Sequence, residues 1–166
     1  TDQAVRVRIE DYDATTPLRV VKTGPGDMTN VDQPNTYTGG TLIRGGRLTA
    51  TNGSALGFGA VTVEADAQAY LAMANATYGN AVVLNGTGPG LDGNIGALRM
   101  NNNSLAGDVT IGAGGARIGA LTGATGTLLG VLGGPGVLEI NSPTPGHAGT
   151  IHLAGLNENS TSTVHV

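Results

Sequence analysis

Short β-forming runs separated by turn residues recur along almost the whole chain, and this alternation limits the fold more than any other feature. Most runs hold three or four residues, and the Gly, Asn, Asp and Ser between them supply positive-φ and side-chain-capped turns. Such spacing suits a chain that turns a corner after each strand, with two or three strands closing one coil. The expected strands are 41–43, 47–49, 61–63, 81–84, 97–100, 109–111, 127–129, 137–140, 150–153 and 163–166.

The composition agrees with narrow coils. The chain has 166 residues, of which 29 are Gly, 4 Tyr, 1 Phe and none Trp, so its core must be built from Val, Leu, Ile and Ala. A sandwich core normally uses several aromatic rings to fill its thickness, whereas one ring of aliphatic side chains fills a solenoid coil. No Gly-X-Y period is present, which excludes collagen. We therefore predict an all-β parallel β-helix (β-solenoid) with Gly-rich turns.

Charge and cysteine content exclude several classes of function. The net charge is −4 and charged residues make up 12%, so there is no basic patch for nucleic acid. The chain has no Cys for a disulfide scaffold or a thiolate metal site. The uncharged window 118–138 has the length of a membrane span, but its Gly pairs favour short strands. We expect contact with a membrane only through an anchor absent from this sequence.

One long repeat is visible. The segment Gly24-Pro25-Gly26 followed by Gly39-Gly40-Thr41 has a counterpart in Gly134-Pro135-Gly136 followed by Gly149-Thr150. These copies define repeat cassettes at about 22–63 and 134–155 within a solenoid covering 22–166. Residues 1–21 are expected to form a separate charged strand region, either a cap or a joining strand.

The two ends of the sequence carry candidate assembly strands. Residues 5–10 alternate apolar with charged side chains, which predicts a half-buried strand whose Arg6, Arg8 and Glu10 face water. Residues 163–166 form an apolar strand without such charges. The possible assembly ends are therefore Val5, Val7, Ile9, Val164 and Val166.

Two segments leave local alternatives open. Residues 64–74 contain helix formers without Gly, so a short helix competes there with a strand at 70–73. The triplet Asn101, Asn102 and Asn103 either begins an asparagine ladder or forms a polar corner.

Candidate chemistry is sparse. His152 and His165 lie on what we expect to be neighbouring strands. A metal site there would need Glu139 or Glu158 as a further ligand. The simpler interpretation is that these two histidines and His147 are exposed. Residues 88–93 approach a calcium-binding β-roll sequence but fail its spacing. The carboxylates after residue 63 are too dispersed for an obvious catalytic pair. We predict no catalytic residues, no cofactor, no metal and no enzymatic activity.

Residues 35–41 carry a specific motif, Asn35-Thr36-Tyr37-Thr38-Gly39-Gly40-Thr41, followed by Gly-Gly-Arg-Leu at 45–48, Ala-Leu-Gly at 55–57 and Val-Thr-Val at 61–63. This pattern resembles the autotransporter-associated β-strand repeat, and residues 134–155 resemble it more weakly. The resemblance implies a right-handed parallel β-helix, a passenger-type segment of a large exported bacterial surface protein, without catalysis.

The motif residues are expected to act structurally. Gly39, Gly40, Gly45 and Gly46 suit corners that exclude a Cβ atom, while Thr36, Thr38 and Thr41 stack on equivalent Thr or Asn of the next coil. Tyr37 is expected to lie across a coil face with its hydroxyl at solvent or a backbone carbonyl.

These observations lead to two hypotheses of function. The first is a structural stalk or adhesin-like module at the bacterial cell surface or outside the cell, in contact with neighbouring coils and a host or matrix surface. The second is an extracellular fibre subunit that stacks end to end.

Overall fold

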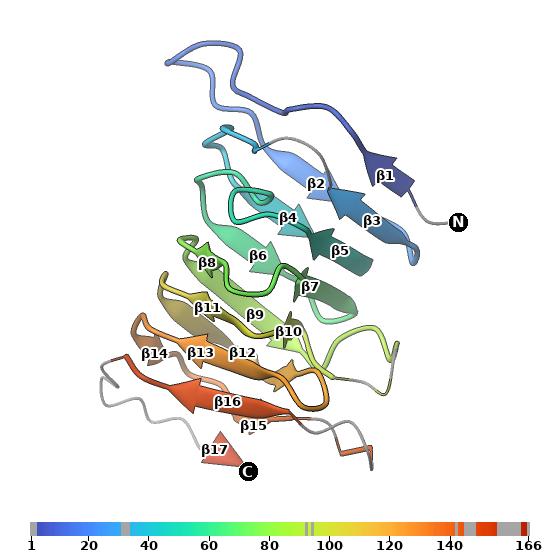
Figure 1. Ribbon diagram of the computed structural model, residues 1–166, viewed down its shortest axis with the longest axis vertical. Helices are drawn as coiled ribbons and strands as arrows, with labels where there is room; N and C mark the ends of the chain where they lie inside the picture. Colours follow the sequence, from blue (N-terminus) through green and yellow to red (C-terminus); the bar gives the residue numbers. More distant parts are fainter. Residues whose placement is uncertain are drawn as a thin grey trace.

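The chain forms a β-solenoid of about six coils whose strands all pair in parallel (Figure 1). The structure is a computed structural model, and it describes residues 3–30, 34–91, 93, 95–141, 143–144, 149–155 and 164–165. Each coil contributes strands to two or three stacks, which we call A, B and C, and corners rich in Gly and Asn join them. The predicted fold class, an all-β parallel solenoid, is confirmed.

Stacks A and B form one 13-stranded sheet. Stack A contains β2 (Val20–Lys22), β4 (Thr41–Ile43), β6 (Val61–Val63), β9 (Val82–Gly86), the first part of β12 (Val109–Ala120) and β14 (Leu132–Gly133). Stack B contains β1 (Gln3–Val5), β3 (Asp27–Asn30), β5 (Gly46–Ala50), β7 (Ala67–Leu71), β10 (Leu98–Met100), the last part of β12, β15 (Leu138–Ile140) and β17 (Val164–His165).

Stack C is shorter and begins later in the chain. It contains β8 (Thr77–Tyr78), β11 (Asn103–Leu105), β13 (Thr125–Leu128) and β16 (Thr150–Leu153). The early coils close their third side with turns over 34–40 and 51–60 instead of a strand. The chain therefore uses two ways to complete a coil.

The strand register shows the length of each coil. In stack A, Val20 pairs with Thr41, Thr41 with Val61 and Val61 with Val82, so the early coils advance by 20 or 21 residues. Val82 then pairs with Val109, an advance of 27 residues. The additional residues form an insertion between β9 and β10, at the corner from stack A to stack B.

The core is a thin aliphatic column. Among its fully buried side chains are Ile43, Val63, Leu84 and Ile111, which succeed one another in stack A, and Leu48, Leu71 and Leu98 from stack B. Two tyrosines, Tyr37 and Tyr78, complete it, whereas the single Phe, Phe58, is 65% exposed. The expectation of an aliphatic core is confirmed, with two buried tyrosines that it did not include.

The corner that leads into stack A explains much of the glycine content. An added Cβ would lie 2.5 Å from Leu18 O at Gly39, 2.0 Å from Asn80 O at Gly107 and 2.4 Å from Gly107 O at Gly130. These distances are shorter than any contact that a side chain tolerates, because each glycine lies directly on the backbone of the preceding coil. The corner therefore admits no side chain at these positions.

The local alternatives are resolved in favour of strands and corners. Residues 67–71 form β7, longer than the strand expected at 70–73, and no helix occurs among the described residues. The window 118–138 breaks into β12, β13, β14 and β15, and the described residues contain no helix with the length and apolar character of a membrane span. Asn102 has a φ of 48° and lies at a corner, and Asn103 begins β11. The corner alternative for this triplet is thus confirmed.

The N-terminal segment differs from its prediction. The strand ends at Val5 instead of Glu10, and Val7 is 65% exposed. Ile9 instead bonds to the motif, since its N–H donates to Asn35 Oδ1 and its carbonyl accepts from Thr36 N. The predicted half-buried strand over 5–10 is wrong because this segment packs as an extended rim on residues 35–36. The boundary proposed between residues 21 and 22 falls inside β2.

Candidate functional site: the motif turn and the outer polar ladder

The motif residues 35–41 hold three coils together. Asn35 is completely buried; its Oδ1 accepts from Ile9 N (2.9 Å) and its Nδ2 donates to Ala55 O (2.8 Å). Gly39 N donates to Leu18 O, and Thr41 N donates to Ala60 O. One seven-residue turn thus bonds to the chain segment before it and to the coil after it.

Tyr37 lies inside the coil. Its side chain is 1% exposed, and its hydroxyl lies 2.6 Å from Thr41 Oγ1, which donates in turn to Leu56 O (3.1 Å). Burial raises the pKa of Tyr37, and its hydrogen bond with Thr41 opposes this effect. The prediction that its hydroxyl reaches solvent or a backbone carbonyl is wrong, because the Thr41 hydroxyl takes that place.

Glycine makes room for this ring. Gly57 has a φ of +68°, and an added Cβ would lie 2.7 Å from Tyr37 Cε2 and 2.6 Å from Tyr37 O. The Ala-Leu-Gly segment of the motif therefore ends in glycine for two reasons, a left-handed backbone and the ring of Tyr37.

Thr41 and Thr38 do not stack on other Thr or Asn as predicted. Thr41 pairs with Val20 and Val61 in stack A. Thr38 is exposed and bonds to Asp11, whose carboxylate accepts from Thr38 N, Thr38 Oγ1 and Leu18 N. These bonds lower the pKa of Asp11, with the Leu18 amide as the largest cause. The sequence does not predict this contact of Asp11, since nothing local links Asp11 to position 38.

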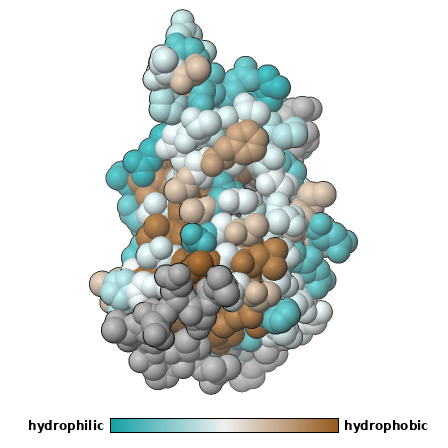
Figure 2. Space-filling model, turned by 90° about the vertical axis from the view of Figure 1, so that its left-hand side faces the viewer, coloured by the Kyte–Doolittle hydropathy of each residue, from teal (hydrophilic) through white to brown (hydrophobic). Residues whose placement is uncertain are grey.

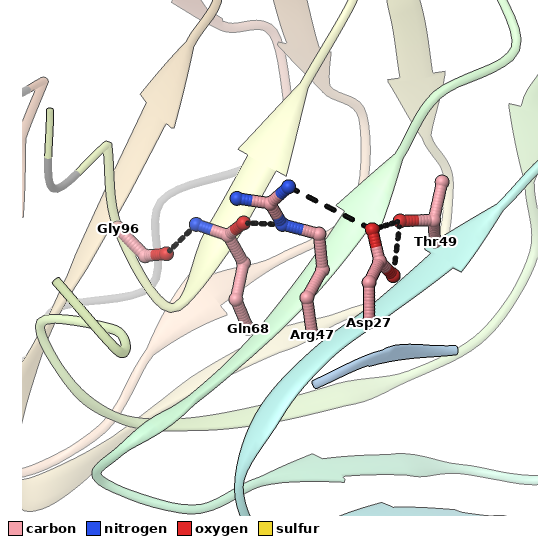
Figure 3. Close-up of polar contacts among 5 residues, drawn as sticks. All are labelled: Asp27, Arg47, Thr49, Gln68 and Gly96. Atoms are coloured by element: carbon pink, nitrogen blue, oxygen red, sulfur yellow. Dashed lines mark hydrogen bonds and ion pairs between the residues drawn. The ribbon is translucent and has the colours of Figure 1, made fainter. Parts of the chain in front are cut away.

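A ladder of largely buried polar side chains crosses the strands of stack B (Figure 3). Asp27, Arg47 and Gln68 occupy one register position on three successive coils. Arg47 Nε donates to Gln68 Oε1 (2.7 Å), and Arg47 Nη1 lies 3.7 Å from Asp27 Oδ2. Gln68 Nε2 donates to Gly96 O (2.7 Å), which ties the insertion to the ladder.

The ladder extends towards the later coils. The Tyr70 ring lies between two guanidinium groups, with Arg47 Cζ 5.9 Å and Arg99 Cζ 4.3 Å from its centroid. Farther along, Arg117 Nε and Nη2 donate to Glu139 Oε2 at 2.9 and 2.6 Å, and these two residues are register partners. Most charged groups on this face therefore join adjacent coils.

Asparagine amides provide a second set of links between coils. Asn80 Nδ2 donates to Gly57 O and Gly59 O, Asn85 Nδ2 to Val63 O, and Asn103 Nδ2 to Leu71 O and Met73 O. These side chains satisfy carbonyl groups of the preceding coil at corners, where regular strand pairing stops.

The outer face of stack C is different, because its hydroxyl groups are not engaged. Thr77, Ser104 and Thr127 align in register, and with Asn75, Asn102 and Thr125 they line a shallow hollow of about 310 Å³. Within the described part of the chain, none of the four hydroxyl groups donates to or accepts from another residue. This uncharged surface is open to solvent.

The candidate metal residues are not brought together. His152 lies in β16 opposite Thr127, whereas His165 lies in β17 opposite Glu139, so the two strands belong to different sheets and the expectation that they are neighbours is wrong. His147, Asp92 and Glu158 lie outside the described residues. Nowhere in the described ranges do three His, Asp or Glu side chains gather as a metal site would require.

The predicted assembly ends are only partly described. Val5 ends β1 and is half-buried, Val7 is exposed and Ile9 packs on the motif. Val164 belongs to β17, and Val166 lies outside the described residues.

No protein-family model, no curated protein and no solved structure matches the chain. The function must therefore be inferred from the residues themselves.

Proposed function

We propose that this chain is a non-catalytic structural segment of a secreted bacterial surface protein, a passenger-type stalk or adhesin-like module. The observation that carries the proposal is the coil-on-coil register of stack A from β2 to β14, in which each strand between these two pairs with the one before and the one after. A solenoid of this kind gains length by adding coils, which is the property that a stalk needs.

The motif supports membership in the autotransporter-associated repeat family. Asn35, Tyr37, Gly39 and Thr41 each make a contact that joins coils or fills the core. Their residue types follow from those contacts, so the motif is suited to building coils and not to chemistry.

The surface suits an extracellular setting. In Figure 2 most of the visible face is hydrophilic or intermediate, and hydrophobic atoms gather in patches in its middle and lower parts. The unengaged hydroxyl groups of stack C offer a neutral polar face for contact with a host or matrix surface.

Surface labelling of intact cells that produce the chain tests this proposal. We expect an antibody against residues 34–91 to label unbroken cells and external protease to remove the label, with a cytoplasmic protein as the control. Labelling only after lysis would contradict it. Electron microscopy of the purified chain tests the alternative, an end-to-end fibre subunit, because only that function requires ordered filaments.

A further inference from the structure

Two Asn-Gly pairs of the chain lie in different surroundings. Asn52-Gly53 belongs to the turn that follows β5, whereas Asn85-Gly86 ends β9. An Asn that precedes Gly loses ammonia readily, because glycine has no side chain to shield its nitrogen from the carbon of the neighbouring amide. The folded structure decides whether this reaction occurs, since it requires a side-chain amide and a backbone that can approach each other.

The amide of Asn85 is fixed between two coils. Its Nδ2 donates to Val63 O of the preceding coil (3.0 Å). Its Oδ1 fills the space above Gly112 of the following coil, where an added Cβ would lie 2.0 Å from it. Gly86 belongs to β9 and pairs with Ala116. Neighbouring coils therefore hold both residues of this pair in place.

The amide of Asn52 is held on one side only. Its Oδ1 accepts from Ser54 N (3.0 Å), which keeps the side chain against the backbone that follows it. Among the described residues, neither its Nδ2 nor the Gly53 N–H has a hydrogen-bond partner. Both residues are partly exposed and lie in a turn outside the strand ladders. The two nitrogen atoms that the reaction involves are therefore free and within reach of water.

We propose that Asn52 is a site of spontaneous modification, at which its amide is converted into a carboxylate. The Gly53 nitrogen loses its proton to a solvent base and attacks Asn52 Cγ, so that the N–Cγ bond forms. The Cγ–Nδ2 bond breaks, and Nδ2 takes a proton from solvent and leaves as ammonia. Water then opens the cyclic imide. Opening at Cγ gives aspartate, and opening at the backbone carbonyl gives isoaspartate, whose main chain contains an additional methylene group.

The modified turn adjoins the motif turn. Ser54 O accepts from Asn35 N (3.3 Å), and Ala55 O accepts from Asn35 Nδ2 (2.8 Å). An additional methylene group at position 52 shifts these two carbonyl groups, so the isoaspartate form should hold the motif less firmly. The inference does not depend on secretion or on surface display, so it can fail while the proposed function holds, and the reverse.

Ageing of the purified chain in neutral buffer made with heavy-oxygen water, followed by peptide mapping, tests the site. Digestion after Arg and Glu places Asn52 in peptide 48–64 and Asn85 in peptide 65–99. In the folded chain, we expect the mass gain of an acid that carries heavy oxygen to develop on the order of tenfold faster at Asn52 than at Asn85. In urea the two rates should be similar, because both pairs then lose their contacts.

Gly53→Ala is the matched variant. Gly53 has no positive φ, and an added Cβ would lie 3.4 Å from Thr77 O, which is an ordinary contact, so the fold accepts the methyl group. The methyl group shields the attacking nitrogen, and modification of Asn52 should slow by about tenfold.

Three results would overturn the proposal. The first is equal rates at Asn52 and Asn85 in the folded chain, and the second is an unmodified Asn52 after the time in which urea exposes both sites to modification. The third is a Gly53→Ala variant that reacts as fast as the wild type, because the glycine nitrogen would then not be the attacking group. The first two need only the wild type, so they decide even if the variant fails to fold.

Hydrogen exchange at the Asn35 amide measures the effect on the motif. We expect faster exchange in the aged chain than in the fresh chain, in proportion to its isoaspartate content. An unchanged rate would overturn the predicted loosening of the motif turn.

Discussion

The early and late coils complete the same cross-section by different means. In the coil that contains 34–40, a turn closes the third side, and the ring of Tyr37 fills the interior above Gly57. In the later coils a strand of stack C closes it, and Leu105 and Leu128 fill the interior. The early solution requires one specific turn, whereas the late solution requires only a short strand with an aliphatic residue facing inward.

The difference explains why the motif is well formed in one place only. A turn that depends on a buried hydroxyl pair and a left-handed glycine tolerates few substitutions. A strand in stack C accepts Tyr78, Leu105 or Leu128 at equivalent positions. The late coils therefore diverge in sequence without losing the coil shape.

The strongest test of this comparison is Gly57→Ala. The new methyl group would meet the Tyr37 ring, and the residue would keep a positive φ, so we expect a loss of about 2–4 kcal/mol in the free energy of unfolding. Urea denaturation followed by circular dichroism measures it. Gly79→Ala is the matched control, because no atom lies within 4 Å of its added Cβ and its φ is not positive. Equal stability of the two variants would contradict our description of the early coil.

Alkaline pH should affect both kinds of coil through their buried tyrosines. Burial raises the pKa of Tyr37 and of Tyr78, so the folded state favours the neutral phenol. Their contribution to stability is complete below the pKa of the unfolded chain, about 10, and declines as the pH rises from there through the raised values. Ultraviolet absorbance should show Tyr37 and Tyr78 ionising only together with unfolding. Ionisation of these two tyrosines near pH 10 while the protein stays folded would refute this.

Removing single hydroxyl groups compares the two tyrosines directly. Tyr37→Phe should cost about 1 kcal/mol, because Thr41 Oγ1 keeps its bond to Leu56 O. Tyr78→Phe should cost about 1–2 kcal/mol, since the Met73 N–H loses its acceptor and Ala50 O loses a donor. Thermal unfolding measures both, with Tyr12→Phe as the neutral control. A larger cost at Tyr37 would mean that its hydroxyl pair contributes more than the link to Ala50.

The smallest effect is expected at the rim of the early coils. Asp11→Asn weakens the bonds to Thr38 and Leu18, so hydrogen exchange at these two amides should accelerate while the midpoint of thermal unfolding stays the same. Because the pKa of Asp11 is lowered, the wild-type hydrogen bonds from Thr38 and Leu18 to the Asp11 carboxylate are intact above the ordinary carboxyl pKa. They are lost as the pH falls through the lowered value. Asp13→Asn, which affects only bonds to Thr15 and its neighbours, is the control. An unchanged rate of hydrogen exchange at the Thr38 amide would show that the Asp11 carboxylate does not hold this rim in place.

Strands with clear β-forming sequence were predictable, and those set by register were not. Strands at 41–43, 61–63 and 150–153 have the predicted bounds. By contrast, β8 and β14 contain two residues each, and β11 reads Asn-Ser-Leu; all three form because neighbouring coils supply partners. Their existence depends on contacts more than 20 residues away in the chain, which no local pattern contains.

The same reasoning applies to the candidate site. The glycines at 39, 40 and 46 were predicted at corners from their residue type, and Gly40 and Gly46 indeed have positive φ. Lys22 is 6% exposed and pairs with Ile43, and an alignment of residues 20–22 with 41–43 would have placed it in the core from the sequence. The hydrogen bonds of Asp11 and the ladder from Asp27 to Gly96 could not be predicted from the sequence, since both require knowledge of which coils are adjacent.

One strand departs from the plan of the other coils. In most coils the chain breaks at the corner between stacks A and B, but β12 continues through it, pairing with β9 and β14 at one end and with β10 and β15 at the other. The register of β12 with β9 shifts between Ile111 and Ala116, so the strand bends at this corner without ending there. Stack A and stack B, which a turn or loop joins in the other coils, therefore pass into one another through a bulged strand at this level.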